Sequence, residues 1–185
     1  ATAKAAAFGC SPYDALLDEY EPDGSSAAID AIFAELADFL PGFLERALAR
    51  QNAMPAPLPL AGPFPVEAQR RLGLRFMEAL GFDFEHGRLD VSHHPFCGGV
   101  PTDVRMTTRY ESHEFLSSLM GIIHETGHGL YEQGLPKEWS NFAIGKARGM
   151  AIHESQSLFV EKQIGRSSEF WEWALPLVHQ HLGPD

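Results

Sequence analysis

Apolar residues recur at intervals of three and four through most of this 185-residue chain, and only its middle departs from that spacing. This spacing is typical of amphipathic helices. Stretches that we expect to form helices are residues 1–8, a short segment beginning at Ser11-Pro12, 26–51, 66–80, 112–134, 145–164 and Ser167 or Ser168 to about Leu182. Pro41 should bend the third of these. The sequence therefore predicts a mainly α fold.

The middle of the chain has a different period. Leu89 and Val91 alternate with polar residues, and so do the apolar residues of 104–110. A period of two predicts strands, so we expect a small antiparallel β-sheet there. Five prolines between residues 55 and 65 predict a connecting loop, because proline lacks the N–H that a helix needs.

Composition excludes several classes of function. The chain has 14 Lys and Arg residues against 25 Asp and Glu residues, a net charge of −11. This charge argues against nucleic acid and against anionic membrane surfaces as partners. No stretch approaches 18 consecutive apolar residues, so we expect no transmembrane helix. Cys10 and Cys97 are far apart in sequence, which favours free thiols in a reducing cytoplasm.

The segment His124-Glu125-Thr126-Gly127-His128 is an H-E-x-x-H motif inside a predicted helix. Positions 124 and 128 lie only about 40° apart around a helix axis, so both imidazoles can bind one ion. Glu125 lies on the flank of that face, which suits a general base acting on a metal-bound water. Gly127 and a glycine at 129 indicate either space for a ligand or close packing of another helix.

A metal site of this kind needs a third protein ligand from another element. Glu154, on the next predicted helix, would complete a His-His-Glu site. His153 is the alternative, since neighbours about 100° apart on a helix cannot share the role. A solvated glutamate is an equally simple interpretation of Glu154.

Asp103, Arg105 and Thr107 share one face of a predicted strand. Arginine suits the binding of a carboxylate, and the aspartate could hold its guanidinium in place. The alternative is an exposed ladder of cross-strand charges.

Four motifs together resemble those of a known family. In chain order they are His94-Pro95-Phe96, Asp103-Val-Arg105-Met-Thr107, His124-Glu125-Thr-Gly-His128 and His153-Glu154-Ser155-Gln156. They resemble the M32 metallocarboxypeptidases, the carboxypeptidase Taq family, and the resemblance runs from Tyr13 to about Trp173.

The resemblance implies a helical zincin-type core and removal of C-terminal amino acids from peptides with broad specificity. One divalent metal, zinc or in some members cobalt, would be bound by His124, His128 and Glu154, with Glu125 as general base. Residues implied to line the substrate cleft are His94, Phe96, Asp103, Arg105 and Thr107. Family members are cytosolic and often homodimeric, so we expect a cytoplasmic protein that forms a homodimer at full length.

Two later family motifs, I-R-x-x-A-D and G-x-x-Q-D-x-H-W, do not occur in the sequence. Family enzymes are also longer, with a helical part before this region. We therefore expect residues 1–185 to be the central part of a single catalytic domain. Two alternatives remain open: a metal-binding fragment without catalysis, and an aminopeptidase or endopeptidase with the same His-His-Glu site.

Overall fold

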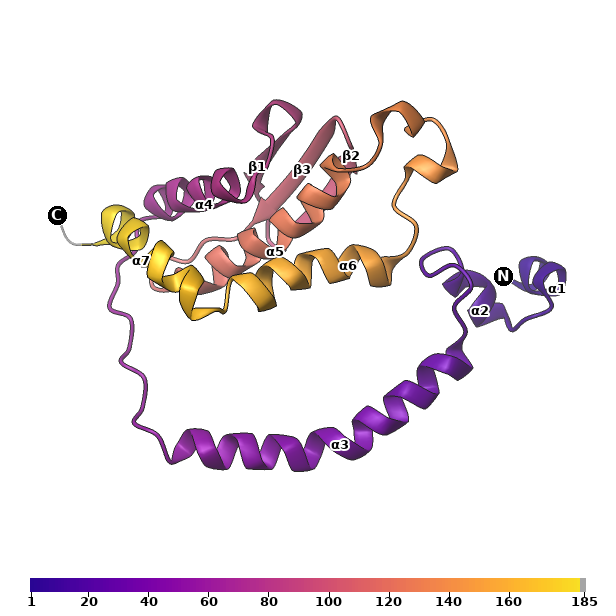
Figure 1. Ribbon diagram of the computed structural model, residues 1–185, viewed down its shortest axis with the longest axis horizontal. Coiled ribbons are helices and arrows are strands. Elements are labelled where there is room, and N and C mark those ends of the chain that lie inside the picture. The colour runs from indigo at the N-terminus through magenta and orange to yellow at the C-terminus, as the bar shows by residue number, and fades with distance from the viewer. Residues whose placement is uncertain (184–185) are drawn as a thin grey trace. The chain divides into compact units, whose positions relative to one another are not determined.

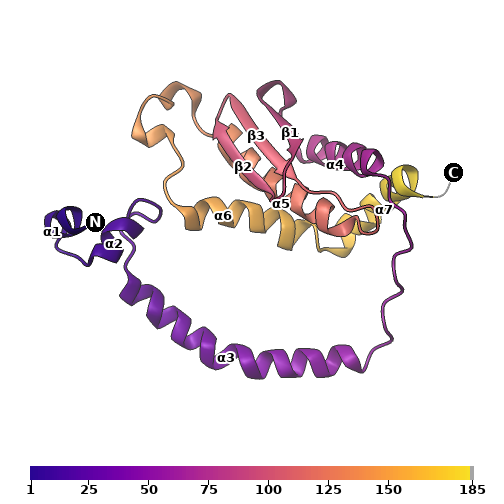
Figure 2. The same ribbon diagram turned by 180° about the vertical axis from the view of Figure 1, so that it is seen from behind.

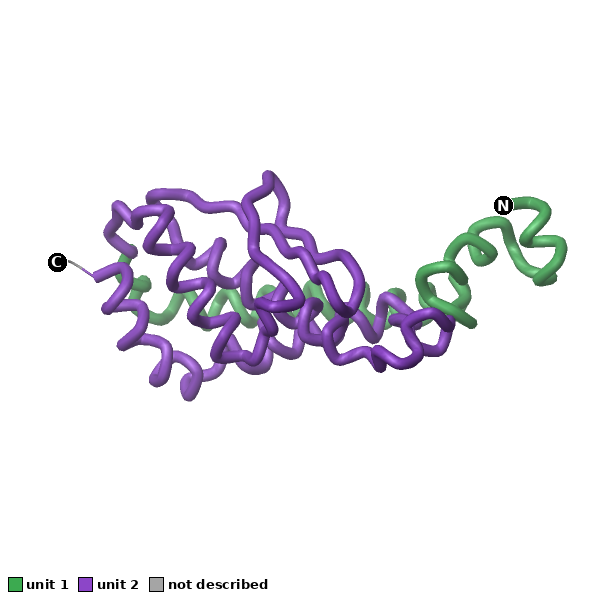
Figure 3. The backbone as a smooth tube through the Cα atoms, turned by 90° about the horizontal axis from the view of Figure 1, so that it is seen from above, with its two compact units in different colours: residues 1–59 green, residues 60–185 purple. Residues whose placement is uncertain are grey.

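A computed structural model describes residues 1–183 of the chain. The chain divides into two compact units, residues 1–59 and residues 60–185, which Figure 3 colours separately. Each unit is described by itself below.

The first unit is entirely helical. Its helices are α1 (Thr2–Phe8), α2 (Pro12–Leu17) and α3 (Ser26–Asn52). Gly9 ends α1 in the left-handed conformation that glycine adopts readily, and the Ser11 side chain caps α2 by accepting the Asp14 N–H. The expected helices are confirmed here. Pro41 lies inside α3, and Figure 1 shows that this helix is bent.

The proline-rich segment predicted to be a loop contains neither helix nor strand from residue 55 to residue 65. The second unit then holds all the remaining elements. They are α4 (Val66–Leu80), η1 (Phe84–His86), β1 (Gly87–Val91), β2 (Phe96–Val100), β3 (Asp103–Thr108), α5 (Leu116–Gln133), η2 (Lys137–Trp139), η3 (Ala143–Gly145), α6 (Met150–Leu158), η4 (Phe159–Ile164) and α7 (Ser168–Leu182).

The three strands form one mixed sheet in the order β1-β3-β2. The β2 and β3 strands are joined by two residues and pair antiparallel, as expected, but β1 pairs parallel with β3. The prediction of an antiparallel sheet is therefore wrong for β1. Alternation identifies a strand and its buried face but carries no information on whether the strand runs parallel or antiparallel to its neighbour. Leu89 of β1 packs with Val104 and Met106 of β3 in one apolar cluster.

Helix α5 lies at the centre of the second unit. One side packs against the sheet, where Ile122 contacts the cluster of Val104 and Met106. Its other side packs through Leu119 and Ile123 against α4, η4 and α7. Figure 2 shows the sheet lying across α5 on one side and α6 running beside it. Both sides of this helix are thus covered.

Two helix boundaries differ from expectation. Helix α5 begins at Leu116 rather than near residue 112, and the Glu114 carboxylate accepts the Ser117 N–H at 3.0 Å. The helix expected over 145–164 begins only at Met150, and its last part, η4, is a π-helix. Apolar spacing locates the body of a helix but leaves its ends uncertain by a few residues. None of the helices in residues 1–183 is long and apolar enough to cross a membrane.

Candidate metal centre

Close packing of α5 against α6 builds the site. A Cβ atom on Gly127 would lie 2.6 Å from the Gln156 carbonyl oxygen and 2.6 Å from Ser157 Cα. A Cβ on Gly129 would lie 2.8 Å from the Phe82 ring and 2.9 Å from Met106 Sδ. Both glycines of the motif therefore permit close packing, one toward α6 and the other toward the sheet. Of the two interpretations offered by the sequence, helix packing is the one observed.

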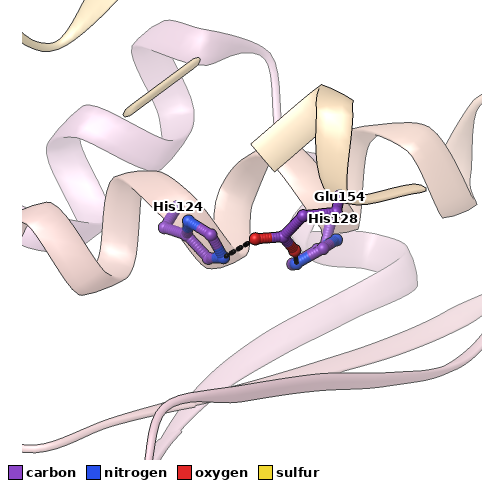
Figure 4. A group of neighbouring side chains, drawn as sticks. All are labelled: His124, His128 and Glu154. Carbon is purple, nitrogen blue, oxygen red and sulfur yellow. Dashed lines mark ion pairs between the residues drawn. The ribbon is translucent and has the colours of Figure 1, made fainter. Parts of the chain in front are cut away.

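This packing brings together the three predicted ligands. One donor atom from each of His124, His128 and Glu154 lies within 4.8 Å of the other two. His128 Nε2 is 3.1 Å from Glu154 Oε2, and His124 Nε2 is 3.7 Å from Glu154 Oε1. Figure 4 shows the carboxylate lying between the two imidazoles. The helical spacing of the H-E-x-x-H motif thus places both rings on one face, as predicted.

The Nδ1 atoms of both histidines have other partners. His124 Nδ1 is 3.0 Å from Glu161 Oε2 of η4. His128 Nδ1 is 2.6 Å from His153 Nδ1, and His153 Nε2 is 2.7 Å from Glu132 Oε1. His153 is therefore engaged through both nitrogens and lies outside the group of three donors. Of the two candidates for the third ligand, Glu154 is the one that lies with His124 and His128.

Electrostatics at His128 favours a neutral ring. Burial lowers its pKa, and the nearby charges of His153 and His124 lower it further, while Glu154 opposes them. Only a neutral imidazole has a lone pair with which to bind a metal. The donor set of two imidazoles and one carboxylate fits zinc, and both Nε2 atoms face the third donor. These three residues could therefore hold one metal ion.

Glu125 lies beside this group on α5 and is only 6% exposed. Burial raises the pKa of its carboxyl group; the charge of Glu154 raises it further, and those of His124 and His94 act in the opposite direction. A carboxylate whose pKa is raised toward neutrality is suited to accept and return a proton.

The pKa of Glu161 is shifted in the opposite direction, below its usual value. Burial acts to raise its pKa, but hydrogen bonds from Lys162, His124 and Arg166 bring it below the usual value. Arg166 Nη2 donates to Oε1 at 3.1 Å, and Lys162 donates to the same oxygen. Glu161 is therefore held as a carboxylate, with Oε2 directed at His124.

The residues of the first two motifs meet at the pairing of β2 with β3. Phe96 is opposite Thr107 in the register, and the Thr107 hydroxyl donates to the His94 carbonyl at 3.0 Å. Pro95 approaches α5 near Gly121, where its Cγ would be 3.5 Å from an added Cβ. His94 therefore lies close enough to α5 to affect the pKa of Glu125.

Asp103 and Arg105 form an exposed ion pair, with Arg105 Nη2 2.9 Å from Asp103 Oδ2. They lie on the face of β3 opposite Val104 and Met106, which pack toward α5. No hydrogen bond or ion pair in residues 1–183 joins this pair to the histidines. The structure confirms the predicted shared face but leaves the pair apart from the three donors.

Three residues around the histidines were not predicted from the sequence: Glu132, Glu161 and, in its observed role, His153. Glu132 follows His128 by four residues on one helix, so spacing could have revealed it. Glu161 lies in the π-helical turn, where α-helical spacing no longer predicts the direction of a side chain.

Known proteins resemble this chain in sequence. The chain matches the family model of the carboxypeptidase Taq (M32) metallopeptidases over residues 1–185. It is 47% identical over 169 residues to "Thermostable carboxypeptidase 1" of Thermus thermophilus, and the aligned residues cover 91% of this chain and 33% of that protein. It is 42% identical over 161 residues to "Carboxypeptidase 1" of Bacillus subtilis, covering 86% and 32% of the two chains.

Solved structures are also similar. "Trypanosoma Cruzi Metallocarboxypeptidase 1" matches with a TM-score of 0.93 and 44% identity, over 100% of this chain and 37% of that one. A Pyrococcus furiosus carboxypeptidase structure matches with a TM-score of 0.83 and 36% identity, over 93% and 35%. The chain thus spans about a third of the length of the curated relatives it matches.

Proposed function

Because this chain belongs to the carboxypeptidase Taq (M32) metallopeptidase family, we propose that it carries the metal-binding and proton-transferring part of a carboxypeptidase. The observation that carries the proposal is the group of His124, His128 and Glu154 beside the buried Glu125. The reaction would release C-terminal amino acids from peptides.

The proposed ligands are His124 and His128, through their Nε2 atoms, and the Glu154 carboxylate. Zinc is the metal that we propose, with cobalt as the alternative, because two imidazoles and a carboxylate are a common donor set for zinc in hydrolases. Bound zinc supplies Lewis acidity, which polarises a peptide carbonyl and lowers the pKa of water.

Glu125 is the proposed general base. Its carboxylate would take a proton from the attacking water and later deliver that proton to the leaving nitrogen. The raised pKa supports this role, because a group that must first accept and then donate a proton works best with a pKa near the operating pH. Glu125 is adjacent in sequence to a proposed ligand, so the same helix turn positions both functions.

The proposed substrate-binding residues are His94, Phe96, Asp103, Arg105 and Thr107. Their proximity through the β2–β3 pairing supports a shared role. Arg105 uses Nε and Nη2 to bind Asp103. Its Nη1 group would remain available as a donor to a substrate carboxylate.

Further proposals concern the whole protein. Residues 1–185 would form the central part of a single catalytic domain, and the full-length protein would be a cytoplasmic homodimer that acts on peptide C-termini. Free Cys10 and Cys97 support the location, since reducing compartments keep thiols unpaired. The net charge of −11 supports a protein without nucleic-acid or anionic-membrane partners.

Mass spectrometry tests the peptidase proposal. The zinc-loaded chain is incubated with a synthetic peptide, and the products are weighed over time. Successive loss of single C-terminal residues would support a carboxypeptidase, whereas N-terminal loss or internal cuts would indicate an aminopeptidase or endopeptidase. Stoichiometric zinc without any cleavage would indicate a metal-binding unit that lacks catalysis.

A further inference from the structure

Two carboxylates outside the ligand group are hydrogen-bonded toward its histidines: Glu161 contacts His124 directly, and Glu132 reaches His128 through His153. We infer that Glu161 and Glu132 are positioning residues for the metal centre, each fixing the tautomer and ring direction of one histidine, with Glu132 acting through His153. The inference rests on the proposed metal site and adds to it the residues that prepare His124 and His128 for binding.

The chain of hydrogen bonds from Glu132 can be followed atom by atom. Its carboxylate can only accept, so the proton between Glu132 Oε1 and His153 Nε2, 2.7 Å apart, lies on the histidine. With this proton on Nε2, the lone pair of His153 Nδ1 would accept a hydrogen bond from His128 Nδ1, which lies 2.6 Å away. His128 therefore carries its proton on Nδ1 and leaves the Nε2 lone pair facing Glu154.

Glu161 acts on the second histidine directly. His124 Nδ1 donates to Glu161 Oε2 at 3.0 Å, which leaves the Nε2 lone pair on the side of Glu154. Arg166 and Lys162 bind the other oxygen of the same carboxylate. These two cations fix the rotation of the Glu161 side chain, so that Oε2 stays directed at the imidazole.

Burial strengthens both arrangements. The side chains of Glu161, His153 and Glu132 are 12%, 15% and 18% exposed, so water competes little for these hydrogen bonds. Hydrogen bonds to ionised groups are stronger than neutral ones, and a ligating histidine held in this way binds metal more tightly.

The same contacts also join α5 to α6 and η4, so a role in stability has to be distinguished from a role in metal binding. Purely structural contacts would lower the stability of the metal-free protein. Positioning contacts would chiefly change metal affinity and the coordination geometry of the bound ion. The experiment therefore measures these properties separately on the 185-residue chain.

Three variants remove or retain the hydrogen bonds. Glu161→Leu and His153→Phe keep side-chain bulk but lose the acceptor, and Glu161→Gln retains one acceptor oxygen. Glu78→Leu is the matched control, because it removes an exposed glutamate that is ion-paired to Arg75 at 2.6 Å on α4. Zinc dissociation constants are measured by competition with a chromophoric chelator. The visible spectrum of the cobalt-loaded chain reports coordination geometry, and circular dichroism reports unfolding of the metal-free chain.

We expect Glu161→Leu and His153→Phe each to weaken zinc binding about 10–100-fold and to alter the cobalt spectrum. Glu161→Gln should restore most of the affinity, and the control should bind zinc like the unmodified chain.

Unchanged zinc affinity and cobalt spectra in both variants would overturn the inference. So would a loss of affinity that follows the loss of metal-free stability and is not restored in Glu161→Gln. Failure of the unmodified chain to bind zinc or cobalt would overturn the proposed metal site itself, and the positioning role with it.

Discussion

Helices α3 and α5 carry the same kind of apolar stripe but bury very different amounts of it. Nine of the 18 residues of α5 are buried in the second unit, whereas none of the 27 residues of α3 is buried within the first unit. Leu40 and Phe43 of α3 are about half exposed, while Ile122 and Ile123 of α5 are almost completely buried. Helical spacing thus identifies a face that can be buried, and the partner has to be found in the structure.

The two helices also differ in what is buried. The buried face of α5 includes Glu125, Thr126 and His128 as well as apolar residues. Buried polar groups are stable only with partners: His128 contacts His153 of α6, and the Thr126 hydroxyl donates to the Ile122 carbonyl of α5 itself. We therefore expect substitutions in α5 to affect both stability and function, and matched substitutions in α3 to affect neither strongly.

The largest expected difference concerns a pair of glutamates. In the full-length protein, Glu125→Gln should lower the proposed release of C-terminal residues about 10²–10⁴-fold, because the amide cannot take a proton from water. Glu35→Gln on α3 should leave this rate unchanged. Peptide products measured by mass spectrometry give the rates, and elemental analysis should find the same metal content in both variants. Retained turnover in Glu125→Gln would remove this residue as the base.

Truncation of an apolar side chain should lower the free energy of unfolding much more in α5 than in α3. Ile123→Ala leaves a cavity in a fully buried cluster and should lower the free energy of unfolding by about 2–5 kcal/mol. Leu40→Ala, at a position that is 48% exposed, should change it by no more than about 0.5 kcal/mol. Urea denaturation followed by circular dichroism measures both. Similar losses would show that the stripe of α3 is buried in solution.

The same glycine-to-alanine change should destabilise the protein in α5 and stabilise it in α3. The added Cβ of Gly127→Ala would meet α6 backbone atoms at 2.6 Å, and overpacking of this kind costs about 1–3 kcal/mol. In Gly42→Ala the nearest atom is Arg46 Nη1 at 3.6 Å, and the helix should gain about 0.5–1 kcal/mol. Thermal melts of the metal-free variants test this. A stabilised Gly127→Ala protein would contradict the close packing of α5 on α6.

Cysteine reactivity should give the smallest difference. Burial raises the pKa of Cys97 to about 12, helped by the charges of Glu125 and Glu132, whereas Cys10 is exposed. Only the thiolate reacts, so at pH 8 iodoacetamide should label Cys97 at least about tenfold more slowly than Cys10. The Cys97 rate should rise with pH up to about 12, since the deprotonated fraction increases. Peptide mapping gives both rates, and equal labelling would mean that β2 is more open than described.

Most of the helices could be predicted from the sequence, because apolar spacing and caps are local signals. The helix over 66–80 and the cap at Ser11 are confirmed. The partner of β1 was not predictable in this way, since strand pairing depends on packing between residues far apart in sequence. The start of α6 at Met150 was also missed, because no side chain caps that end.

The candidate site was also predictable only in part. The proximity of His124 and His128 follows from the helix period, and the family motifs identified Glu154. The hydrogen bonds of His153 and Glu161 could not be predicted, because each depends on the side-chain direction set where α6 and η4 pack against α5. The assigned roles of these residues as ligands, base and substrate contacts remain predictions.

The arrangement of the metal centre also has a consequence for folding kinetics. Every residue that we assign to the ion or to the orientation of its histidines lies between positions 124 and 161, on α5, α6 and η4. Closing a chain segment of roughly 40 residues costs little more entropy than closing a segment half as long, and local contacts form quickly. Once α5 and α6 dock, the donors are therefore assembled without waiting for more distant pairings such as that of α4 with α7.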